Sequence, residues 1–121
     1  MEPCAQKRTG KHNAELVEAV FRLMFEILWV APYDRRRGNA AWREFDLTAR
    51  RAVQLLASTD FAAASPEQFG TVLRTAELLV RCIGRFGQEH LFSPARYTEA
   101  LALARRVADR VREAAACGAE A

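Results

Sequence analysis

Arginine is the residue type in this sequence that is best suited to bind a partner. The chain has 16 Arg and 2 Lys against 15 carboxylates, and its formal net charge is +3. A guanidinium group presents several N–H donors in one plane, and this geometry matches phosphate and carboxylate groups. The arginines therefore predict binding to a nucleic acid or to an acidic protein. The alternative is that they are only part of a solvated surface, because exposed surfaces of helical bundles are usually a mixture of Arg and Glu.

The arginines are clustered along the chain. Three are consecutive in the stretch APYDRRRGNAAWREF, and more follow in the later segments. Repeated cations are sufficient for contact with a phosphate backbone, and such binding depends steeply on salt and little on base sequence. The predicted nucleic-acid-binding residues are Arg35, Arg36, Arg37, Arg43, Arg50, Arg51, Arg74, Arg105, Arg106 and Arg110.

Catalysis is not expected, because the chain has no recognisable constellation of catalytic groups. His12 lies in a polar N-terminal segment and His90 in a short polar turn. Cys4, Cys82 and Cys117 lack the spacing of a zinc site or a disulfide framework. We therefore expect no enzyme activity, no cofactor and no metal. An unrecognised enzyme would need His90 or Cys82 beside a carboxylate in a buried cavity.

Four amphipathic segments must position the arginines. Apolar residues recur in them at steps of three and four, as in α-helices, and the chain has only 6 Gly and 4 Pro. Ser65-Pro66 and Ser93-Pro94 each supply a helix cap followed by a proline in the first helical position. The predicted helices are 14–31, 40–58, 66–86 and 94–116, and they predict an all-α, up-down-up-down four-helix bundle over residues 13–116.

The two ends of the chain are expected to lie outside the bundle. Residues 1–12 are polar and basic and read as a flexible arm, with Asn13 as the cap of the first helix. Residues 117–121 are expected to be a disordered tail. The longest apolar run, residues 19–31, is too short and too charged to span a membrane. The N-terminus has no apolar stretch of a secretory signal, so a cytoplasmic location is expected.

The first predicted helix is apolar over most of its circumference. Its charged residues form a single narrow stripe, whereas a helix in a monomeric bundle needs only one apolar face. Two explanations are open: the extra surface meets another subunit, or this helix is the central one and is surrounded by the other three. The first explanation predicts a homo-oligomer with a subunit interface at Phe21, Phe25, Leu28 and Trp29.

Several features occur in a fixed order over residues 17–113. They are an aromatic and aliphatic first helix closed by Pro32 and the consecutive arginines, Leu73 and Arg74 at the opening of a hydrophobic third helix, and Ser93, Pro94 and Tyr97 at the start of the fourth. In this order the chain resembles the four-helix-bundle family of the accessory variability determinant (Avd) of diversity-generating retroelements. That family is similar to the proteins encoded in intervening sequences of bacterial 23S ribosomal RNA genes.

The resemblance implies a basic, pentameric barrel that binds nucleic acid and the retroelement reverse transcriptase. Such a protein is needed for mutagenic copying of a template RNA. We therefore expect a non-enzymatic accessory protein whose partners are a reverse transcriptase and its template RNA or cDNA. The residues alone leave a second reading open, in which the chain is a helical protein–protein adaptor or a small subunit of a larger complex without nucleic-acid contact.

Overall fold

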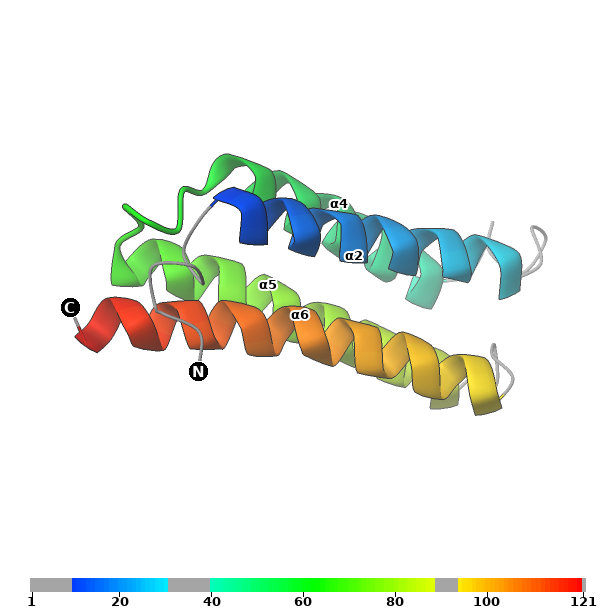
Figure 1. Cartoon of the computed structure of the whole chain (residues 1–121). Helices are drawn as coiled ribbons and strands as arrows, with labels where there is room; N and C mark the ends of the chain where they lie inside the picture. The colour runs from blue at the N-terminus through cyan, green and yellow to red at the C-terminus, as the bar shows by residue number, and fades with distance from the viewer. Residues whose placement is uncertain (1–9, 31–39, 89–93, 121) are drawn as a thin grey trace.

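The described part of the chain is all-helical. The computed structural model describes residues 10–30, 40–88 and 94–120. Within these ranges it has four helices and no strand: α2 (Gly10–Val30), α4 (Ala40–Ser58), α5 (Pro66–Gln88) and α6 (Pro94–Glu120). Consecutive helices run in opposite directions, as Figure 1 shows. The expected all-α, up-down-up-down four-helix bundle is thereby confirmed.

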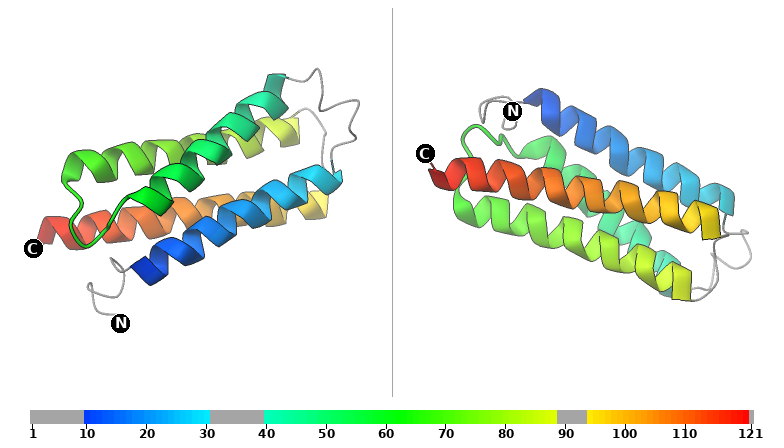
Figure 2. Two further views of the ribbon diagram at one scale, coloured as in Figure 1. Left: turned by 90° about the horizontal axis from the view of Figure 1, so that it is seen from above. Right: turned by 60° about the horizontal axis from the view of Figure 1, so that its bottom comes forward.

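Each helix packs against two others, so the four form a closed ring. The packed pairs are α2 with α4, α4 with α5, α5 with α6, and α6 with α2. Figure 2 shows α5 and α6 side by side along most of their length. In this ring the boundary between α2 and α6 lies on the opposite side of the bundle from the boundary between α4 and α5.

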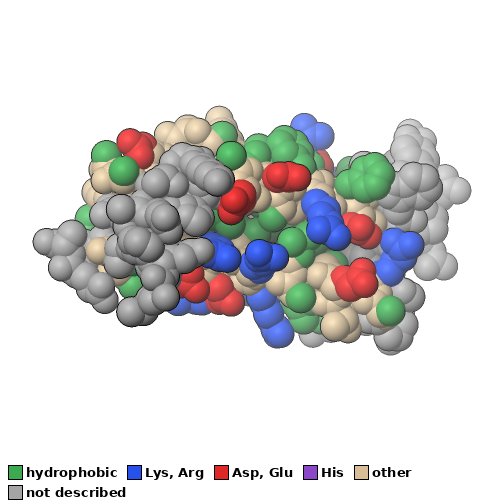
Figure 3. All heavy atoms as spheres, viewed as in Figure 1, with side chains coloured by type: hydrophobic (Ala, Val, Ile, Leu, Met, Phe, Trp, Pro, Cys, Tyr) green, Lys and Arg blue, Asp and Glu red, His purple; other side chains and the backbone are tan. Residues whose placement is uncertain are grey.

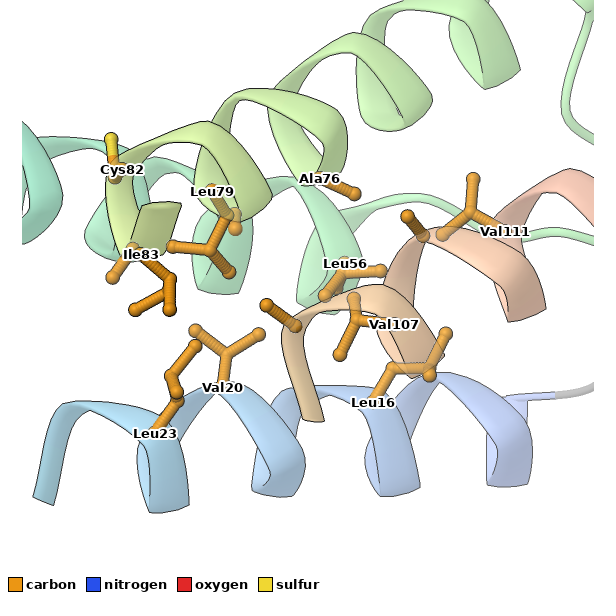
Figure 4. Close-up of a cluster of buried hydrophobic side chains, with 14 of the residues drawn as sticks. Leu16, Val20, Leu23, Leu56, Ala76, Leu79, Cys82, Ile83, Val107 and Val111 are labelled. Carbon is orange, nitrogen blue, oxygen red and sulfur yellow. The ribbon is translucent and has the colours of Figure 1, made fainter. Parts of the chain in front are cut away.

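The core is built from aliphatic side chains at helical spacing, together with the buried rings of Phe45, Phe61 and Phe69. Leu23 and Ile27 of α2, Leu79 and Ile83 of α5 and Val107 of α6 are almost completely buried. Figure 4 shows side chains from the different helices pointing toward one another. Burial of a side chain of this kind is worth about 1.5 to 3 kcal/mol relative to exposure, and such contacts hold the helices that carry the surface arginines.

The helix α2 is not the central helix of the bundle. It packs against α4 and α6 on one side, while Phe21 and Phe25 have 54% and 57% of their surface exposed. The interpretation in which the other three helices surround this helix is therefore wrong. The apolar surface that the sequence indicated on α2 faces outward at these two phenylalanines.

Asn13 does not cap α2, which is a correction to the expected boundary at residue 14. The helix already begins at Gly10. The Asn13 side chain is 6% exposed, and its Nδ2 donates hydrogen bonds to the carbonyl oxygens of Leu56, at 2.8 Å, and Thr59, at 2.6 Å. Asn13 thus binds the C-terminal end of α4 instead of its own backbone, and residues 10–12 belong to the helix and not to an arm.

The helix α6 extends beyond its expected end at residue 116, as far as Glu120. Ala114, Ala115 and Ala116 favour the helix strongly, and no proline follows to stop it. Cys117, expected in a disordered tail, is 9% exposed. By contrast, the expected start of α5 is confirmed: Ser65 precedes Pro66, the first helical residue, and its Oγ accepts a hydrogen bond from the backbone N–H of Gln68 at 3.2 Å.

Candidate nucleic-acid interface

Two contacts fix how α4 and α5 face each other. Arg85 Nη1 lies 2.7 Å from Glu44 Oε2, and Cys82 Sγ lies 3.8 Å from Thr48 Oγ1. The helices are antiparallel, so each step forward on α4 is matched by a step backward on α5. One further turn along each helix therefore places Arg51 opposite the segment around Leu78, with about 1.5 Å of rise per residue.

The outer side of this boundary carries arginines from both helices. Arg43 and Arg51 of α4 are exposed, as are Arg74 and Arg81 of α5. Arg74 and Arg81 are separated by seven residues, which is about two helical turns, so they share one side of α5. Arg105 of α6 is also exposed and lines a groove between α5 and α6 together with Arg81.

These arginines have no carboxylate partner among the residues that the structure describes. Arg43, Arg51, Arg81 and Arg105 make no ion pair there, and Arg74 donates to the hydroxyl of Thr71 at 3.4 Å. We call the set Arg43, Arg51, Arg74, Arg81 and Arg105 the basic face. Since none of its members is in an ion pair with a described carboxylate, their N–H groups can bind an anionic partner.

Other arginines near this face are already paired. Arg50 Nε lies 3.1 Å from Asp46 Oδ2 on the same helix. Arg112 binds Asp109 at 2.8 Å and Glu77 at 3.4 Å, so both of these carboxylates are engaged. Exposed pairs of this kind contribute roughly 0 to 1 kcal/mol to stability. These pairs engage four carboxylates of this side, Glu44, Asp46, Glu77 and Asp109, and Glu77 and Asp109 line the same α5–α6 groove as Arg81 and Arg105.

Arg106 and Arg110, although predicted with the others, lie on the opposite side of the bundle. Together with Arg22 they line a groove of about 320 Å³ between α2 and α6. The same groove is lined by as many glutamates, Glu15, Glu18 and Glu113. Figure 3 shows blue and red side chains gathered along the boundary between these two helices. This groove has no excess of positive charge. Arg106 and Arg110 therefore lie apart from the basic face, and unlike the arginines of that face they share their surface with an equal number of carboxylates.

Several predicted residues lie outside the described part of the chain. Arg35, Arg36 and Arg37 fall within residues 31–39, which the structure does not describe. The side chains of Leu28 and Trp29 are likewise not described, although both residues belong to α2. These predictions stay predictions, whereas Phe21 and Phe25 of the expected subunit interface are exposed.

Arg81 belongs to the basic face but is not among the predicted binding residues. Arg81 lies seven residues after Arg74, and this spacing indicates that the two arginines share one side of the helix. However, Glu77 lies between them in the sequence and suggests that its carboxylate neutralises their charge. In the structure Glu77 accepts a hydrogen bond from Arg112 of the neighbouring helix and not from Arg81. Because that contact joins residues 35 positions apart, it is not visible in the local pattern.

Cys82 is buried between α4 and α5 and behaves as a core residue. Desolvation by burial is the main cause that raises the pKa of its thiol above the ordinary value, and the hydrogen bond to Thr48 works in the opposite direction. The thiolate is therefore disfavoured at neutral pH. Within the described residues, no group of three or more His, Cys, Asp or Glu side chains is arranged to hold a metal ion.

Comparison with known proteins adds no relative to these observations. No protein-family model, no curated protein and no solved structure matches the chain. In the part of the chain that the structure describes, none of the helices has the length and apolar character needed to cross a membrane. The resemblance to the Avd family stays a prediction.

Proposed function

We propose that this chain is a non-enzymatic accessory protein that binds RNA or cDNA through the basic face. The observation that carries the proposal is the exposure of five arginines, from three neighbouring helices, without a carboxylate partner among the described residues. Such cations bind phosphates and release counterions, which provides affinity without base recognition. The bundle keeps the arginines on one rigid surface, so little order has to be created on binding.

The mode of binding follows from the chemistry of the basic face. Among the described residues, the exposed aromatic side chains are Phe21 and Phe25 on α2, and neither belongs to this face. Base stacking needs such aromatic side chains, and sequence readout needs an element that enters a groove. We therefore expect the protein to hold a strand by its backbone, with little preference for base sequence.

The partner and the assembly in this proposal rest on the resemblance. An Avd-like role names a reverse transcriptase as partner, a diversity-generating retroelement as context, a pentameric barrel as assembly and the cytoplasm as location. The exposure of Phe21 and Phe25 on α2 supports an assembly of several copies. Repetition of the basic face by symmetry would join several weak sites on one strand into a strong one.

The alternative function is a helical adaptor that contacts proteins and no nucleic acid. One observation favours it: Leu47 and Leu78 on the α4–α5 side have 69% and 45% of their surface exposed. Exposed leucines bind apolar side chains of a protein and gain nothing from a phosphate backbone. RNA-binding measurements separate the two functions, because the adaptor has no salt-dependent affinity for RNA.

The test compares two triple variants of equal charge. Arg51→Gln, Arg74→Gln and Arg81→Gln remove three charges from the basic face, and Arg22→Gln, Arg106→Gln and Arg110→Gln remove three from the α2–α6 groove. Fluorescence anisotropy with a labelled RNA across a salt series measures affinity. We expect the basic-face variant to bind at least about tenfold more weakly and to lose about 0.7 in salt slope for each phosphate contact removed.

The groove variant is the matched control and should change affinity far less. Circular dichroism of both variants checks that each is still folded. Two results contradict the proposal: wild-type protein that has no affinity for RNA at low salt, or equal losses in the two variants. Equal losses show that net charge, and not the arrangement of the basic face, governs binding.

A further inference from the structure

The boundary between α4 and α5 carries two leucines that a monomer leaves in water. Leu47 is 69% exposed and Leu78 is 45% exposed. Leu47 immediately precedes Thr48, which contacts Cys82 across the boundary, and Leu78 lies one turn before Cys82 on α5. Both leucines are therefore exposed along the same boundary, and they are offset from each other by about one helical turn along it.

Each of these leucines stands between two arginines of its own helix. Leu47 has Arg43 one turn before it and Arg51 one turn after it, and residues four apart lie on one side of a helix. Leu78 has Arg74 four residues before it and Arg81 three residues after it. None of these arginines is in an ion pair with a described residue. The two leucines thus form a short apolar strip across the boundary, and each leucine has an unpaired arginine about one turn before it and about one turn after it on its own helix.

We propose that this strip docks an acidic amphipathic helix of a partner protein. The apolar side chains of that helix cover Leu47 and Leu78, and its carboxylates, placed on both edges of its apolar stripe, pair with Arg43, Arg51, Arg74 and Arg81. A helix presents apolar residues at steps of three and four, so two of them one turn apart can cover two leucines that lie about one turn apart along the boundary. Charge complementarity commits the site to an acidic partner, because a basic or neutral helix would leave the arginines facing no anion.

The leucines distinguish this partner from a nucleic acid. A phosphate backbone pairs with the arginines but offers no apolar surface that would cover the leucines, and the leucines cannot stack on bases as aromatic rings do. Since the partner helix and a nucleic acid require the same arginines, they compete for the basic face. The inference rests on the proposed function only for this competition, because the docking of the helix needs no RNA.

The probe is a labelled synthetic peptide that forms an acidic amphipathic helix, with leucines on one side and glutamates on both edges of the leucine stripe. A peptide of the same composition in scrambled order is the control ligand. The test variant carries Leu47→Gln and Leu78→Gln, which keep helix propensity. The control variant carries Phe21→Gln and Phe25→Gln, which remove exposed apolar side chains from α2.

We expect the wild-type protein to bind the ordered peptide and not the scrambled one. The leucine variant should bind it at least about tenfold more weakly, and the phenylalanine variant should bind it as wild type does. The leucine variant should bind RNA within about twofold of wild type, and unlabelled ordered peptide should displace RNA from the wild-type protein. These results together support a docking site that reads both charge and apolar surface.

Failure of the inference and failure of the proposed function give different results. Equal binding of the two peptides, or unchanged peptide binding by the leucine variant, overturns the docking site and leaves RNA binding as proposed. RNA binding that is lost together with the leucines also overturns it, because the leucines then serve the nucleic acid. Leucine-dependent peptide binding by a protein without affinity for RNA supports the docking site and contradicts the proposed function.

Discussion

Asn13 connects the first turn of α2 to the end of α4. Its Nδ2 binds two carbonyl oxygens at that end, Leu56 O at 2.8 Å and Thr59 O at 2.6 Å. The last carbonyls of a helix have no partner within the helix, so a side chain that donates to them supplies bonds that are otherwise missing. Asn13 therefore stabilises the packing of α2 against α4. The sequence had instead predicted that Asn13 caps the N-terminus of its own helix.

Replacement of Asn13 should destabilise the fold measurably. Asn13→Ala removes both hydrogen bonds and leaves buried acceptors unsatisfied, so we expect a loss of about 1 to 3 kcal/mol in the free energy of unfolding. Urea unfolding followed by circular dichroism measures it. Asn13→Asp is the sharper variant, because Asp has nearly the same shape but cannot donate, while it favours the N-terminal turn of a helix. If the Asp variant is as stable as wild type, the contact between helices is not the role of Asn13.

The hydrogen-bond partners of Asn13 cannot be recognised from its neighbours in the sequence. An asparagine before an apolar run is a valid cap signal, and nothing within ten residues of Asn13 shows that α4 ends beside it. Its acceptors are 43 and 46 positions away along the chain. A side chain that can bond either locally or across the bundle is assigned correctly only after the helices have been placed.

At the scale of the element, the start of α5 is specified by four consecutive residues. Ser65 Oγ accepts from the backbone N–H of Gln68 at 3.2 Å, and Gln68 Oε1 accepts from the backbone N–H of Ser65 at 2.7 Å. This reciprocal arrangement satisfies two N–H groups that have no partner in the helix. All of its determinants are local, which is why the start at Pro66 could be predicted from Ser-Pro alone.

Loss of this cap should weaken α5 without affecting the basic face. We expect Ser65→Ala to lower the free energy of unfolding by about 0.5 to 2 kcal/mol. Gln68→Ala tests the reciprocal bond, and the double variant should cost less than the sum of the single ones, because both bonds hold the same backbone turn and each is weakened when the other is lost. Ser58→Ala, at the end of α4, is the control and should change little. Additive losses in the double variant would contradict the reciprocal arrangement.

Helix ends that depend on packing were predicted less well than ends that depend on local signals. Cys117 was expected in a tail, yet it is buried, and α6 continues to Glu120. The sequence shows Gly118 as a possible stop, yet the helix runs past it. Periodicity thus predicted that the four helices exist, while the first helix begins and the last helix ends four residues beyond the predicted bounds.

At the scale of the whole molecule, the arrangement of charge is a property of the ring of helices. Arg105 and Arg106 are adjacent in the sequence, yet Arg105 lines the α5–α6 groove and Arg106 the α2–α6 groove. A rotation of about 100° per residue separates them. The sequence supplies the number of arginines, but which arginines share a surface follows only from the order in which the helices pack.

The exposed phenylalanines of α2 also bear on the whole molecule, because they can mediate the association of one bundle with another. Phe21 and Phe25 are 54% and 57% exposed, and their spacing of four residues places them on one side of the helix. Burying an aromatic side chain removes about 150 to 250 Å² from water, and apolar area is worth about 25 cal/mol per Å². Because each ring is already about half buried, a contact that covers both rings on each partner removes roughly 300 to 500 Å² of apolar surface from water, and this burial favours association by about 8 to 13 kcal/mol before the entropic cost of association is subtracted.

We accordingly expect wild-type protein to form a homo-oligomer and the double variant Phe21→Gln, Phe25→Gln to be a monomer of unchanged fold. Light scattering coupled to size-exclusion chromatography gives the mass, and circular dichroism gives the helix content. The variant Leu47→Gln, Leu78→Gln is the control, and its oligomeric state should match wild type. A monomeric wild type contradicts the expected assembly, and an unchanged mass in the phenylalanine variant shows that the subunits meet at another surface.

Since several copies repeat the basic face, the monomeric variant should also bind long RNA more weakly, while its affinity for a short RNA that contacts one subunit should stay the same.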